Sequence, residues 1–108
     1  MKNRLNGILN TINDFYLYDD QVAQKYIALI NEAIELICDL KATSTSLLEN
    51  AINEALTELR NELANRMNDN FFNAPPERKK SEFKISKMLV AVAIGNVLSN
   101  LSAANTKG

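Results

Sequence analysis

The stretch KMLVAVAIGNVLSNL, residues 87–101, is the least polar part of this 108-residue chain and decides how it folds. A membrane-spanning helix needs about 20 predominantly apolar residues, whereas the uninterrupted apolar run here covers only residues 88–95. Polar residues then return at Asn96, Ser99 and Asn100. The stretch therefore predicts a helix packed inside a small helical protein rather than a transmembrane segment.

Two apolar faces appear on this helix when successive residues are placed about 100° apart. The face expected to line the core holds Phe83, Val90, Ile94, Val97 and Leu101. The opposite face is apolar in its first half, at Ile85, Met88, Leu89 and Val92, and polar in its second half. A lone four-helix bundle normally buries one face of each helix. The second face therefore predicts a further contact, either with an N-terminal helix, another subunit or a binding target.

We expect this second face to be a protein interface, with Ile85, Met88, Leu89 and Val92 as its residues. Soluble proteins rarely leave a contiguous apolar patch uncovered. Two-fold contact with an identical chain is the commonest way to cover one. The predicted partner is therefore another protein, most simply a second copy in a homodimer.

Small residues form a row on the same helix at Ala91, Gly95 and Ser99, each four positions from the next. Such a row lets another helix approach closely. A glycine inside a helix usually has a packing reason. The row favours close packing within the core, with an intersubunit contact as the alternative.

The rest of the chain carries the same helical periodicity. Only two prolines and three glycines interrupt it. Asp19 is a good N-cap, Ser46 and Glu49 have capping-box spacing, and Asn6-Gly7 weakens the start of the first helix. The sequence predicts an all-α fold: an antiparallel helical bundle of about four helices, at approximately 3–17, 20–41, 47–70 and 76–104, forming a single helical domain over 1–108.

The third predicted helix is the most clearly amphipathic. Its apolar face is predicted to hold Leu48, Ile52, Ala55, Leu56, Leu59, Leu63 and Met67. Glu54, Glu58 and Glu62 are spaced four apart and are assigned to the solvated face or its edge. Exposed carboxylates keep ordinary pKa values, so this row is not expected to perform acid–base catalysis.

The chain lacks the usual chemistry of an enzyme. It has no histidine, which removes the commonest general base and metal ligand. Its one cysteine, Cys38, is followed by Asp39 near a helix end and is expected to be a small packed residue rather than a reactive thiol. No glycine-rich phosphate loop or nucleophile-elbow motif occurs. No catalytic residue, metal or cofactor is expected, and the protein is predicted not to be an enzyme.

The charges are distributed unevenly along the chain. Residues 19–72 are acidic, whereas residues 73–108 carry six cations and two carboxylates. A possible nucleic-acid contact consists of Arg78, Lys79, Lys80, Lys84 and Lys87. Clustered cations bind phosphates, although Phe83, the one aromatic residue among them, is assigned to the core face rather than to base stacking. The simpler interpretation is that this basic segment lies against the acidic second and third helices.

A single cysteine permits no intramolecular disulfide, and Asn6, Asn10 and Asn13 interrupt any signal-peptide core, so a cytoplasmic location is expected. Fifteen asparagines suggest an AT-rich genome, in a bacterium, phage or mobile element. The favoured function is that of a small protein-interaction protein: an adaptor, inhibitor or regulator acting through an apolar helix face. The alternative is a nucleic-acid-binding regulator using segment 78–87.

Overall fold

The computed structural model describes residues 2–15, 19–41 and 46–106, and these residues form helices with no strand among them. The helices are α1 (Lys2–Asn13), α2 (Asp20–Lys41), α3 (Ser46–Arg66), α4 (Asp69–Phe72) and α5 (Pro76–Thr106). Four are substantial, and α4 is a single turn. The predicted all-α class is confirmed.

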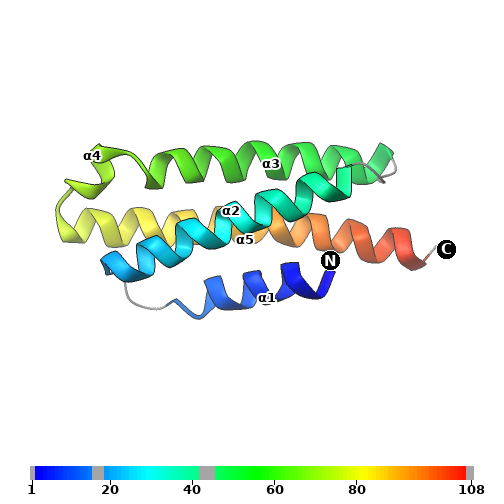
Figure 1. The fold of residues 1–108 in the computed structure, drawn as a ribbon, viewed down its shortest axis with the longest axis horizontal. Helices are drawn as coiled ribbons and strands as arrows, with labels where there is room; N and C mark the ends of the chain where they lie inside the picture. Colours follow the sequence, from blue (N-terminus) through cyan, green and yellow to red (C-terminus); the bar gives the residue numbers. More distant parts are fainter. Residues whose placement is uncertain (1, 16–18, 42–45, 107–108) are drawn as a thin grey trace.

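The four long helices form a ring in which each contacts its two neighbours, in the order α1, α2, α3 and α5. Neighbouring helices run in opposite directions, with α3 along one side of α5 and α1 along the other (Figure 1). The bundle measures 49 × 22 × 17 Å. Because packed helices lie about 8–10 Å apart, its smallest dimension corresponds to two layers of helix.

Helix α1 begins earlier and ends earlier than predicted. It starts at Lys2 and runs through Asn6-Gly7 without a break. The burial of Leu5 and Ile8 in the core explains why tertiary packing overrides the turn preference of that dipeptide. The helix ends at Asn13 rather than at residue 17, and the Phe15 amide bonds to the Ile12 carbonyl in a tightened last turn. Residues 16 and 17 lie outside the described residues.

The boundary between the first two long helices contains the expected cap. The Val22 amide donates a hydrogen bond of 2.7 Å to Asp19 Oδ1, which satisfies one of the unpaired donors at a helix start. At the other long boundary, α5 begins at Pro76. A proline fits the first helical position because the amide proton it lacks would have no partner there.

Helix α3 ends at Arg66, four residues before the predicted end. The reason is local. Asn68 starts the separate turn α4, with its Oδ1 accepting a bond of 2.8 Å from the Asn70 amide and its carbonyl accepting one from the Phe71 amide. Asparagine commonly begins such turns. Met67 was predicted to face the core and is 58% exposed, because the helix that would have buried it has ended.

The core lies between the four long helices and contains the predicted apolar faces. The side chains with no solvent exposure include Leu5, Ile12, Tyr26, Ile30, Ile37, Ile52, Leu59, Val90, Ile94 and Val97. Each fully buried aliphatic side chain contributes about 1.5–3 kcal/mol relative to an exposed one. The helical phases read from the sequence are therefore correct for the four long helices, except toward the end of α3, where Glu62 is buried and Met67 is exposed.

The row of small residues on α5 does not serve close packing within this chain, so the favoured interpretation is wrong. A Cβ atom built on Gly95 would meet no atom of a neighbouring element within 4 Å. Ala91 is half-buried and Ser99 is exposed. Ala91 borders the shallow hollow between α1 and α5, and no neighbouring element packs against Gly95.

Candidate functional site

The candidate site is an apolar strip on the outside of α5, called the outer stripe and consisting of Ile85, Met88, Leu89 and Val92. Their side chains are 58%, 62%, 40% and 62% exposed, respectively. The other large apolar side chains left exposed among the described residues, Met67 and Phe72, belong to the α3–α4 end. The outer stripe is thus a local concentration of apolar surface on one helix.

The ring arrangement explains why the outer stripe is uncovered. Val90, Ile94 and Val97 point into the bundle and have no exposure, which turns the opposite side of α5 to the outside. Helix α1 packs on one side of α5 and not across its back. Of the three alternatives for covering the second apolar face, an N-terminal helix of the same chain is therefore wrong.

One edge of the outer stripe is acidic. Leu89 lines a shallow hollow between α3 and α5 together with Glu54, Glu58 and Ala93. Its volume is about 170 Å³, below the roughly 300–1,000 Å³ of a typical small-molecule site. Glu54 is exposed and Glu58 is half-buried. These two carboxylates are called the acidic flank.

The other edge of the outer stripe is basic. Met88 lines a second shallow hollow, between α1 and α5, together with Lys84, Lys87 and Asn13. Lys84 is exposed. Lys87 donates a hydrogen bond to the Phe15 carbonyl just beyond α1, with its Nζ 5.1 Å from the centre of the Phe83 ring. These two lysines are called the basic flank.

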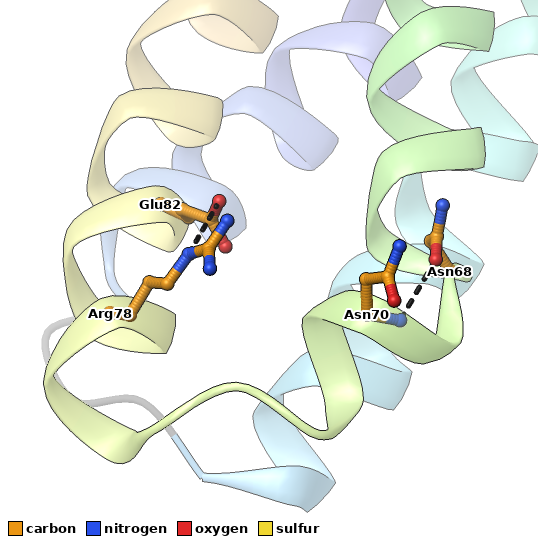
Figure 2. A network of polar contacts seen from close by, with 4 residues as sticks. All are labelled: Asn68, Asn70, Arg78 and Glu82. Atoms are coloured by element: carbon orange, nitrogen blue, oxygen red, sulfur yellow. Dashed lines mark hydrogen bonds and ion pairs between the residues drawn. The ribbon is translucent and has the colours of Figure 1, made fainter.

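The predicted nucleic-acid residues do not form one continuous surface. Lys84 and Lys87 lie beside α1, so the idea that they pack on the acidic second and third helices is wrong. Arg78 lies near the α3–α4 end instead, and Figure 2 shows it facing Asn68 and Asn70 across a gap. Its Nε is 3.5 Å from Glu82 Oε1 on the same helix. Lys79 is half-buried, whereas Lys80 is exposed.

A buried polar cluster occupies the interior behind the outer stripe. The hydroxyl groups of Tyr26 and Ser86 share a hydrogen bond of 2.6 Å. The Tyr26 ring packs edge-on against Phe83, with 4.9 Å between ring centres. Burial raises the pKa of the Tyr26 phenol well above its ordinary value, and the Ser86 hydrogen bond opposes that rise. The phenol therefore stays neutral and joins α2 to α5.

Glu62 and Arg66 extend this cluster, and neither was predicted from the sequence to be buried. Glu62 was assigned to the solvated face or its edge but is buried, as is Arg66. Both charges act on the Tyr26 phenol. The Arg66 guanidinium lies 4.3 Å from the centre of the Phe71 ring, while its Nε and Nη1 have no hydrogen-bond partner among the described residues. Their burial could have been predicted from their spacing, since Glu62 and Arg66 follow the buried Leu59 at i+3 and i+7 and so continue the core face of α3.

Other chemistry-bearing groups do not assemble into a site. Cys38 is half-buried, and its sulfur lies 3.7 Å from Arg60 Nη2, which donates to it. Within residues 2–15, 19–41 and 46–106, no group of three or more acidic or cysteine side chains is placed to hold a metal ion. The outer stripe with its two charged flanks is thus the most distinctive surface of the described chain.

By length and composition, Pro76–Leu101 is apolar enough to cross a membrane, with a mean hydropathy of 1.2 in its most apolar window. A central helix of a bundle has the same composition, and α5 buries one face in the core.

Comparison with known protein families, curated proteins and solved structures finds no match for this chain. Evidence on function therefore comes from the chain's own residues.

Proposed function

We propose that this chain is a non-enzymatic protein-interaction protein of the cytoplasm, an adaptor, inhibitor or regulator, that acts through the outer stripe of α5. One observation carries the proposal: four large apolar side chains are 40–62% exposed on a single helix face. Exposed apolar surface of this kind commonly marks an interaction site. The proposed first partner is a second copy of the chain, because two-fold self-contact is the commonest assembly.

The charges beside the outer stripe favour a protein partner over a membrane or a nucleic acid. Glu54 and Glu58 line one edge of the stripe. Carboxylates there would be repelled by anionic lipids and by phosphates, so an anionic partner that covers the stripe could be attracted only along the other edge, at Lys84 and Lys87. Of the five predicted nucleic-acid residues, Arg78 forms an ion pair with Glu82, and Lys87 donates a hydrogen bond to a backbone carbonyl. The nucleic-acid alternative therefore has less support than self-association.

Sedimentation equilibrium tests the proposal. Four apolar side chains make a smaller contact than a standard interface, so wild type is expected to dimerise in the range of about 1–300 µM. Met88→Glu with Val92→Glu is expected to give a folded monomer, because each glutamate would be buried without a partner. A wild-type protein that stays monomeric over that range would contradict self-association.

Met67→Glu is the matched control for this experiment. Met67 is 58% exposed and lies at the α3–α4 end, away from the outer stripe. This variant is expected to dimerise like wild type. The remaining alternatives are checked with the same proteins: sedimentation with anionic vesicles for a membrane surface, and salt-sensitive retention on heparin for a nucleic acid.

A further inference from the structure

The two edges of the outer stripe carry opposite charges on opposite sides of one helix. Glu54 and Glu58 lie on the α3 side, and Lys84 and Lys87 lie on the α1 side. Helices α3 and α1 lie on either side of α5 (Figure 1). A molecule that approaches the stripe therefore meets negative charge along one edge and positive charge along the other.

This polarity distinguishes the two ways in which identical copies can pair through the stripe. If the two α5 helices run in the same direction, the two-fold axis lies along them and exchanges their edges, so each acidic flank faces the partner's basic flank. If they run in opposite directions, the axis lies across them and each acidic flank faces the partner's acidic flank. Like charges placed opposite each other across an interface are unfavourable.

We infer that the chain forms a two-fold dimer whose α5 helices run parallel, with the acidic flank of each copy against the basic flank of the other. Leu89 lines the hollow on the α3 side and the adjacent Met88 lines the hollow on the α1 side, so the two charged flanks lie at a similar level along α5. This inference rests on the proposed self-association and adds the orientation of the partner.

Disulfide cross-linking distinguishes the two orientations. In a parallel dimer Val92 lies opposite Val92 of the second copy. In an antiparallel dimer centred on Met88 and Leu89, Val92 lies opposite Ile85 of the second copy. The Val92 residues of the two copies are then about 10 Å apart along the helix axis. A disulfide needs Cα atoms within about 7 Å of each other. Each cysteine is introduced into a Cys38→Ser background, which removes the native thiol.

On mild oxidation, the Val92→Cys variant alone is expected to form a covalent dimer. A covalent dimer that forms only when Val92→Cys is mixed with Ile85→Cys would establish the antiparallel arrangement and overturn the inference. Sedimentation of the reduced proteins is measured first. Absence of any dimer there removes the proposed self-association and the inference together, whereas a dimer with the antiparallel cross-link removes the inference alone.

Charge reversal gives an independent test in solution. Glu58→Lys and Lys84→Glu are each expected to weaken self-association about tenfold at low salt, because each homodimer then sets like charges against each other. An equimolar mixture of the two variants is expected to recover the wild-type dissociation constant, since both edges of the mixed dimer are complementary. If the Glu58→Lys variant instead associates more tightly with wild type than with the Lys84→Glu variant, the acidic flanks face each other and the inference is overturned.

Discussion

The phenolic oxygen of Tyr26 on α2 lies 2.6 Å from the hydroxyl oxygen of Ser86 on α5, inside the bundle and 60 residues away in sequence. The two helices lie diagonally across the ring. The two hydroxyl groups are hydrogen-bonded to each other in a region where water has no access. A buried hydroxyl without a partner would destabilise the fold, so this pair specifies how α2 lies relative to α5.

Removing either hydroxyl is expected to destabilise the protein. Tyr26→Phe and Ser86→Ala each leave one buried polar group unpaired and should lower the free energy of unfolding by about 1–3 kcal/mol. The double variant should lose less than the sum of the two, with a coupling of about 0.5–3 kcal/mol. Urea unfolding of the four proteins measures the coupling. Strictly additive losses would mean that the hydrogen bond contributes nothing.

Stability is expected to fall at alkaline pH because of Tyr26. Burial raises the pKa of this phenol in the folded chain, while the unfolded chain ionises near its ordinary value of about 10. The stability contributed by the neutral phenol is therefore complete below about pH 10 and is lost as pH rises further. The loss from this group reaches at most about 1.4 kcal/mol per pH unit.

The control for the pH dependence is Tyr26→Phe, which keeps the ring and removes the ionisable group. Its free energy of unfolding should decline less steeply than that of wild type between about pH 10 and 11.5. The other tyrosines of the chain are present in both proteins and cancel in the comparison. Identical slopes in the two proteins would contradict the assignment to Tyr26.

The helical phase of α3 predicts opposite outcomes for two nearby positions. Leu59 has no solvent exposure, whereas Asn61 is exposed. Leu59→Ala should lower the free energy of unfolding by about 2–5 kcal/mol, the usual range for truncating a buried leucine. Asn61→Ala should change it by less than about 0.5 kcal/mol. Thermal or urea unfolding checks both, and similar effects would refute this phase.

Gly95→Ala is expected to stabilise the protein. Gly95 lies inside α5, has no positive φ and has open space where a Cβ would lie. Alanine is favoured over glycine within a helix by about 0.5–1 kcal/mol. Urea unfolding should show an increase of that size, measured with the outer stripe disabled by Met88→Glu and Val92→Glu. A decrease would show that the backbone at Gly95 cannot accept a side chain.

Gly7→Ala provides a matched comparison, since Gly7 also lies inside a helix with no atom of a neighbouring element near its Cβ position. A gain at both positions attributes the effect to helix propensity. If Gly95→Ala also weakens self-association of the otherwise unmodified protein while Gly7→Ala does not, the row of small residues on α5 contacts the second copy.

Part of the candidate site was predictable from the sequence. The periodicity of α5 identified Ile85, Met88, Leu89 and Val92 as a face distinct from the core, and all four are exposed. The charged edges of that face were not predictable. Glu58 and Lys84 belong to different helices, and their placement on opposite sides of the stripe depends on which helix packs on which side of α5. Sequence periodicity contains no information about that choice.

The sequence by itself determined the helical class, the approximate span of each long helix and the side of each that faces the core, because periodicity, capping residues and Pro75-Pro76 act over a few residues. Only the tertiary structure decided the order of the ring, the burial of Glu62 and Arg66 and the pairing of Tyr26 with Ser86. These features depend on neighbours distant in sequence. Burial of apolar area favours the arrangement in which the core faces of the four long helices cover one another, and that arrangement leaves the outer stripe of α5 exposed.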